Sequence, residues 1–150
     1  MSAYYNEFMD SYIGKGISLN IFNDTTHSSD TCSGEEKINA SIKMILSTRP
    51  GERVFMPEFG SNLFRVVFEP NDMIAADMIK LYVGDSLQKW EKRIVVQSIT
   101  VGTEGEENVV PVSIYYTFRN SNVSGCYVYP FNLRVDGSKS TYNFGTYNAN

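Results

Sequence analysis

The sequence predicts an α+β fold in which a small mixed or antiparallel sheet packs against two main helices. Two segments, from about residue 33 to 49 and from about residue 73 to 91, carry apolar residues at helical spacing, and three strand patterns follow them. Helices followed by a group of strands are typical of α+β proteins. The 150 residues fit one domain, and a hydrophobic content of 42% is too high for a disordered chain.

The single domain divides into three parts along the chain. Residues 1–16 are predicted to form a docking arm, because aromatic side chains recur there among polar residues. Residues 17–133 form the expected core, which opens with a short alternating strand pattern over residues 17–21. Residues 134–150 are rich in Ser, Asn, Gly, Thr and Tyr, so we expect a flexible tail.

The first helix is expected to begin near Ser33. Ser33 and Glu36 fit the S-x-x-E capping box, in which each side chain bonds the free backbone N–H of the other residue. The apolar residues that follow at helical spacing are Ile38, Ile42, Ile45 and Leu46. Pro50 and Gly51 end the helix. Residues 52–70 look irregular, but their apolar side chains are numerous enough to indicate a loop that is packed down: Val54, Phe55, Phe59, Leu63, Phe64, Val67 and Phe68.

The second helix is expected to run from about Met73 to Glu91, with Asp72 as its N-cap. One face is apolar and consists of Ala75, Met78, Ile79, Tyr82, Val83 and Trp90. Glu91 falls on the opposite, polar face in the last turn. A carboxylate there opposes the helix dipole, which indicates that Glu91 serves a need other than helix stability.

Three strands are expected after the second helix. The segment Ile94–Val101 is rich in β-branched residues. The next segment alternates apolar and polar residues from Val110 to Phe118, and Pro111 suggests an edge position at its start. A turn over residues 120–125 leads into the third strand, Cys126–Leu133.

The composition predicts no catalytic residue, cofactor or metal. One histidine (His27) and two distant cysteines provide too few ligands for a zinc site, and no phosphate-binding glycine motif is present. Cys32 and Cys126 could form a disulfide or remain reduced thiols.

A net charge of −4 gives no general attraction to nucleic acid. No apolar run approaches the ~20 residues of a membrane span, and the N-terminus lacks the regions of a signal peptide, so we expect assembly in the cytoplasm.

Carboxylates leave one enzymatic alternative. Glu58, Glu69 and Glu91 each lie beside an aromatic residue. A carboxyl group in an apolar setting can have a raised pKa and act as a general acid in glycoside hydrolysis. With 17 acidic residues in the chain, the same pattern also arises without any catalytic meaning.

Three ordered motifs carry a family resemblance that covers residues 38–101: Thr48-Arg49-Pro50-Gly51-Glu52-Arg53, Pro57-Glu58-Phe59-Gly60 and Trp90-Glu91-Lys92-Arg93-Ile94. With these motifs the chain resembles the baseplate wedge and sheath-initiator family of contractile tails, which occurs in phages, tail-like bacteriocins, type VI secretion baseplates and related injection particles. The usual helix end of that family is Glu-Pro-Arg. Here Lys92 stands in place of the proline, so the angle of the helix-to-strand turn is the least secure part of the resemblance.

The resemblance implies a structural, non-enzymatic baseplate component whose fold is like the conserved domain of the sheath subunit. It implies that Glu91, Lys92 and Arg93 contact the wedge proteins and that strand pairing starts the sheath. The implied sheath-facing residues are Val110, Val112, Ile114, Tyr116, Phe118, Cys126 and Val128, and the implied turn residues are Arg49, Gly51, Arg53, Glu58, Phe59 and Gly60. Tube or spike hub proteins are further implied partners, with several copies of the chain in a six-fold ring in the baseplate of the assembled particle.

Other interpretations of these motifs stay open. The arginines of Thr48–Arg53 could cap the carbonyls of the first helix, and Pro57–Gly60 also fits a core turn. Glu91 and Arg93 could be solvated charges. Some members of the family are labelled lysozyme-like, which keeps a peptidoglycan-cleaving tail enzyme as the alternative function.

Overall fold

A computed structural model describes residues 13, 14, 16, 17, 31, 32, 34–68, 73–102, 109–119 and 123–132. The elements in chain order are β1 (Gly16–Ile17), β2 (Thr31–Cys32), α2 (Gly34–Ser47), the 3-10 helix η1 (Asn62–Phe68), α3 (Met73–Trp90), β3 (Ile94–Val101), β4 (Val109–Phe118) and β5 (Ser124–Asn132). Most of the predicted arm, the Ser33 cap, the Asp72 cap and the tail lie outside the described residues.

The main sheet is antiparallel, with strand order β3-β4-β5, and β1 pairs with β2 in a separate antiparallel pair. This arrangement confirms the predicted α+β class. Pro111 does not mark an edge, because β4 is the central strand and Pro111 lies opposite Pro130 of β5. The edge prediction for this strand is therefore wrong. Among the described strands, β3 and β5 each keep one unpaired edge, and the β3 ladder is interrupted by a register shift between Val96 and Ser98.

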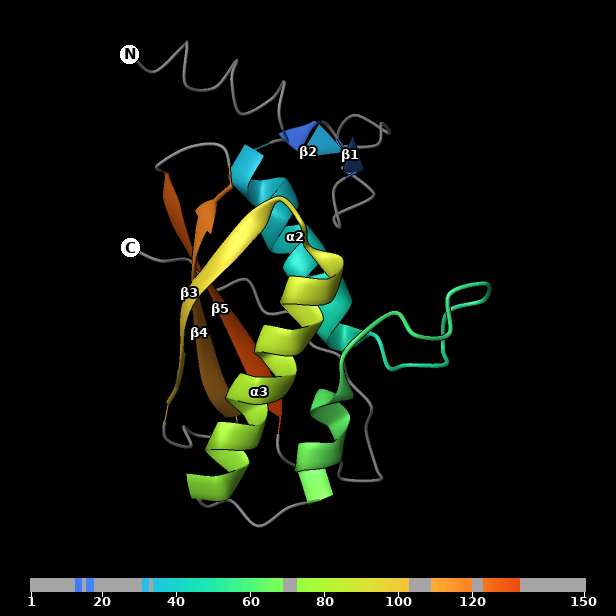
Figure 1. Cartoon of the computed structure of the whole chain (residues 1–150), viewed down its shortest axis with the longest axis vertical. Coiled ribbons are helices and arrows are strands. Elements are labelled where there is room, and N and C mark those ends of the chain that lie inside the picture. Colours follow the sequence, from blue (N-terminus) through green and yellow to red (C-terminus); the bar gives the residue numbers. More distant parts are fainter. Residues whose placement is uncertain are drawn as a thin grey trace, which may run out of the picture.

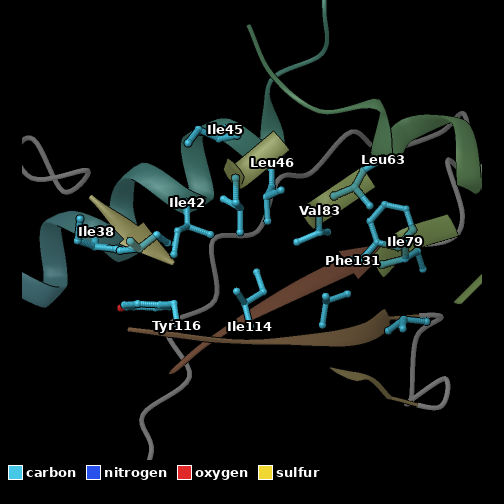
Figure 2. Packing of buried hydrophobic residues seen from close by; sticks show 14 of the residues in the cluster. Ile38, Ile42, Ile45, Leu46, Leu63, Ile79, Val83, Ile114, Tyr116 and Phe131 are labelled. Carbon is cyan, nitrogen blue, oxygen red and sulfur yellow. The ribbon is translucent and has the colours of Figure 1, made fainter. Parts of the chain in front are cut away.

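Both main helices lie on the same side of the sheet (Figure 1). The predicted apolar face of α2 is confirmed, since Ile38, Ile42, Ile45 and Leu46 are all buried. Figure 2 shows Ile38 and Ile42 opposite Tyr116 and Ile114 of β4, and Ile79 and Val83 of α3 near Phe131 and Leu63 at the other end of the cluster. The core is thus a layer of side chains between the helices and one face of the sheet.

The segment 52–70 differs from its prediction in two ways. Residues 62–68 are not irregular but form η1, which places Leu63 and Val66 in the core at 3-10 spacing. The loop before it is packed down only at its base. Phe59 is buried, but Val54 and Phe55 are 75% and 97% exposed, so their apolar character does not come from a role in the core.

Tyr116 provides a first prediction, because its buried hydroxyl donates a hydrogen bond to Asn39 Oδ1 at 2.8 Å. The Tyr116→Phe variant keeps the edge-to-face contact of this ring with Phe118 but loses the hydroxyl. We expect the free energy of unfolding in urea to fall by about 1 kcal/mol. The control is Tyr115→Phe, at a neighbouring position that is 45% exposed, which should be neutral. Equal losses in both variants would contradict a specific role for the Asn39 bond.

Candidate functional site

The junction between α3 and β3 is organised around an ion pair. Glu91 directly follows α3, and its N–H donates to Leu87 O at 2.9 Å. Arg93 directly precedes β3 and folds its guanidinium back onto Glu91, with Nε 2.6 Å from Oε1 and Nη2 2.6 Å from Oε2. A two-point contact of this kind fixes the relative orientation of both groups. It therefore constrains the angle at which the chain leaves the helix.

Glu91 does not point outward as expected, because its side chain is only 3% exposed, while the Arg93 side chain is 28% exposed. The outward direction was expected because the helical spacing of α3 was continued by one residue, to Glu91. The helix ends at Trp90, so the turn and not the helical period sets the direction of Glu91. The carboxylate lies inside the junction and the guanidinium lies between it and the surface.

Two opposing influences set the pKa of Glu91. Burial raises the pKa, but hydrogen bonds from Arg93 and Ser41 and the positive charge of Arg93 outweigh burial and hold it below its ordinary value of 4.5. Glu91 is therefore ionised at neutral pH. Because Ser41 belongs to α2, the same carboxylate ties α2 to the end of α3.

Further hydrogen bonds tie the junction to the N-terminal segment and to β4. Arg93 Nη1 donates to Ile13 O at 3.3 Å, and the backbone N–H of Arg119 donates to Arg93 O at 2.9 Å. Lys92, at the position where the family prefers proline, donates from Nζ to Gln88 O at 2.8 Å and so binds a free carbonyl at the end of α3. The junction leaves Lys92 exposed and part of Arg93 accessible.

The two turn motifs close a single loop, residues 48–60. The N–H of Gly51 donates to Pro57 O at 2.7 Å, and the N–H of Ser61 donates to Thr48 O at 2.9 Å. The ring of Phe59 packs against Trp90 with centroids 5.2 Å apart. The backbone of both motifs thus forms turns of one loop, whose two ends are joined by the bond between Ser61 and Thr48.

The arginines of this loop do not make the hydrogen bonds that cap α2 among the described residues. The cap on Met44 O comes instead from Thr48, whose N–H and hydroxyl lie 3.2 and 2.7 Å away. The guanidinium of Arg49 lies over Phe64 at 5.4 Å from the ring centroid, and that of Arg53 lies over Phe59 at 4.5 Å. Both arginines are exposed.

The strand residues assigned to the sheath divide into two groups. The side chains of Val110, Val112, Ile114, Tyr116 and Phe118 are at most 2% exposed and face the core of this chain. They are therefore not available for direct contact, because the helices already cover them. Cys126 and Val128 are exposed on the opposite face of the sheet, where Tyr115 and Val95 are also more than 40% exposed. The sequence showed that apolar and polar residues alternate along the strand, but it did not show which face of the sheet the helices cover.

Among the described residues, the two carboxylates that could serve an enzyme are each paired with a cation. Glu58 is exposed and bonds Lys89 Nζ at 2.8 Å, and this hydrogen bond and the charge of Lys89 lower its pKa. The pKa of Glu91 is also lowered, whereas a general acid needs a raised pKa. Glu69 lies outside the described residues.

The described part of the chain contains no cluster of three side chains able to hold a metal ion. No described helix combines the length and apolar character needed to cross a bilayer. Cys32 is buried and Cys126 is exposed, and no disulfide joins them, so the disulfide alternative does not occur.

Comparison with known proteins points to baseplates. The family model described as baseplate wedge protein gp25 matches residues 32–123. The baseplate wedge protein gp25 of Enterobacteria phage T4 is 32% identical over 84 residues, which are 56% of this chain and 58% of the T4 protein. The chain thus matches less than two thirds of the length of that relative.

Solved structures give the same fold. A candidate tail lysozyme from Geobacter sulfurreducens is 36% identical with a TM-score of 0.63, covering 68% of this chain and 93% of that one. A chain of the postcontracted pyocin R2 baseplate is 25% identical with a TM-score of 0.54, covering 71% and 99%. A chain of the anti-feeding prophage baseplate shares the fold with a TM-score of 0.60 at 15% identity, covering 87% and 94%.

Proposed function

Because the chain belongs to the baseplate wedge protein gp25 family of contractile tails, we propose that it joins wedge proteins at the α3–β3 junction and starts the sheath at its sheet. The observation that carries this proposal is the family match over residues 32–123, which includes the junction and both β3 and β4. The anti-feeding prophage baseplate was solved with six-fold symmetry, which supports several copies in a ring. Tube or spike hub proteins are further proposed partners, and the arm, core and tail division is proposed for the single domain.

At the junction, we propose different roles for the three motif residues. Glu91 is buried and holds Arg93 in place. Lys92 and the accessible part of Arg93 therefore present the cationic surface that a wedge protein would contact. An ionised carboxylate behind Arg93 keeps its guanidinium oriented before any partner arrives, which lowers the entropic cost of the contact.

At the sheet, addition of a strand to an unpaired edge is the proposed contact with the sheath subunit. β4 is bonded on both sides, so the available edges are β3 and β5. β5 contains Pro130, which has no backbone N–H to donate. A surface hollow lies beside β3, lined by Leu81 and Gly84 of α3 and by Val95 of β3. These features favour β3 as the pairing edge, with Cys126 and Val128 as side-chain contacts on the open face.

A non-enzymatic role is part of the proposal. It is supported by the lowered pKa values of Glu58 and Glu91, which are opposite to the shift that a general acid requires. No feature of the described residues favours the lysozyme alternative. Support for it comes from the description of the Geobacter protein as a candidate tail lysozyme.

Charge reversal at Lys92 tests the junction. The variant is produced in particle-producing cells that lack the wild-type chain. Lys92→Glu should reduce the copy number of the chain in purified particles at least tenfold relative to wild type. A carboxylate at position 92 would face the negative charge of a partner that binds lysine, and like charges across an interface cost several kcal/mol. The melting temperature of the isolated variant should fall by only a few degrees, because Lys92 is exposed and the change removes one surface bond to Gln88 O at the end of α3. The matched control is Arg65→Glu, the same reversal on η1. Wild-type copy number with Lys92→Glu would refute the junction assignment.

A further inference from the structure

The loop of residues 48–60 carries an apolar tip that its own chain does not use. The tip consists of Val54, Phe55 and Met56, which are 75%, 97% and 40% exposed. Figure 1 shows the loop extending away from the helices, on the side opposite the sheet in this view. A phenylalanine held almost entirely in water loses the benefit that burial of its ring would provide. The exposed tip is therefore unfavourable for the free energy of folding of the isolated chain.

The backbone at the tip adds to that cost. Phe55 has φ of +66°, and it is the single non-glycine residue with positive φ among those described. This backbone conformation costs an aromatic residue about 1–3 kcal/mol, and it persists only where the surrounding structure imposes it. Because Phe55 is 97% exposed, packing of its ring does not impose the positive φ.

The stem of the loop imposes the conformation instead. Its backbone bonds run from Glu52 N to Arg49 O at 3.1 Å, from Gly51 N to Pro57 O at 2.7 Å, from Met56 N to Arg53 O at 3.3 Å and from Phe59 N to Met56 O at 3.0 Å. The N–H of Arg49 also donates to Glu52 Oε2 at 2.9 Å. At the base, Phe59 packs on Trp90. The tip is thus presented by a bonded stem fixed to the end of α3.

The charges around the tip indicate what kind of surface would receive it. Arg49 and Arg53 lie over aromatic rings and form no ion pair with a described residue. By contrast, Glu58 is neutralised by Lys89, and Glu52 is engaged by the backbone N–H of Arg49. The two arginines outnumber Glu52, the carboxylate of this loop that forms no ion pair with a described residue. The surface beside the tip therefore carries an excess of positive charge, although the whole chain has a net charge of −4.

We propose that the tip, residues 54–56, inserts into an apolar socket of another protein of the particle, and that carboxylates on the rim of the socket pair with Arg49 and Arg53. The inference rests on the family assignment and not on the Lys92–Arg93 surface. The hollow beside β3 of a second copy is a poor match, because Lys80 and Arg119 line it together with a single carboxylate, Asp85. A lipid surface is also disfavoured, because the tip offers only three apolar side chains.

The test separates stability from assembly. Phe55→Gly removes a ring that packs on nothing and relieves the positive φ, so the melting temperature of the isolated variant should lie within about 2 °C of wild type or above it. Its copy number in purified particles should fall at least tenfold. Phe55→Leu, which keeps an apolar tip, should retain most of the wild-type copy number. Arg53→Glu should also lower it.

A photoreactive phenylalanine analogue at position 55 identifies the receiving surface in assembled particles. A crosslink to a different protein chain, at a peptide with apolar and acidic residues, supports the proposal. A crosslink to a second copy of this chain, or binding of the isolated wild-type chain to phosphatidylglycerol vesicles that Phe55→Gly abolishes, overturns it. Wild-type copy number with Phe55→Gly also overturns it, whatever the result with Lys92→Glu.

Discussion

Replacement of Glu91 by alanine is expected to lower the free energy of unfolding by about 2–3 kcal/mol at pH 7. The change leaves the partly buried guanidinium of Arg93 without its carboxylate and removes the bond to Ser41. Loss of one partner of a fully buried pair costs about 3–5 kcal/mol, and exposure of the Arg93 side chain reduces that cost here. Urea unfolding followed by circular dichroism measures the difference.

The pH dependence distinguishes the ion pair from a mere loss of volume. The pKa of Glu91 is lower in the folded chain than its ordinary value of 4.5, so its ionisation contributes stability that is fully present above pH 4.5. That contribution is lost as the pH falls through the lowered, folded-state pKa. The difference between wild type and Glu91→Gln, a change of nearly equal size, should therefore shrink from pH 7 towards pH 3. A difference that stays constant over this range would show that charge is not its source.

Glu58→Ala is the matched control for this experiment. Glu58 also has a lowered pKa and a lysine partner, but both side chains of that pair are more than half exposed. Exposed pairs contribute little to stability because water and salt screen them. We expect Glu58→Ala to unfold at the same urea concentration as wild type. A loss as large as that of Glu91→Ala would mean that burial does not separate the two carboxylates.

Gly60→Ala is expected to lower the free energy of unfolding by at least about 3 kcal/mol. Gly60 has φ of +118°, a conformation that residues with a side chain rarely adopt, and a Cβ at this position would lie 2.2 Å from Thr48 O. That oxygen accepts the hydrogen bond from the N–H of Ser61 that closes the loop. The variant must therefore both strain the backbone and break the closure, two effects that add.

Gly51→Ala separates these two effects. Gly51 also has positive φ, +93°, but a Cβ there would meet no atom within 4 Å. Its cost should be the backbone strain alone, about 1–2 kcal/mol. Trypsin cleavage after Arg53, measured beside urea unfolding, should increase strongly in Gly60→Ala and little in Gly51→Ala. Equal effects on both readouts would exclude the close contact with Thr48 as the cause.

The amino-acid sequence determined the two main helices with their buried faces and the three strands of the main sheet. The spacing of Ile38, Ile42, Ile45 and Leu46 predicted the buried side of α2, and the alternation in β4 predicted a half-buried strand without showing what covers it, because periods of 3.6 and 2 follow from backbone geometry alone. The ordered motifs also indicated the family, which the match over residues 32–123 confirmed.

Only the tertiary structure decided where the motif residues point and which surfaces remain free. Glu91 turned inward because the helix ends one residue before it and Arg93 folds back to neutralise it. β4 became central despite Pro111, because strand order depends on long-range pairing that local propensity does not encode. The apolar side chains of the loop were divided between the core and the solvent by the hydrogen bonds of its stem. These bonds are local turns that hold the tip away from the core. The number of apolar residues does not show them, which is why composition predicted a packed loop and the structure has an exposed tip.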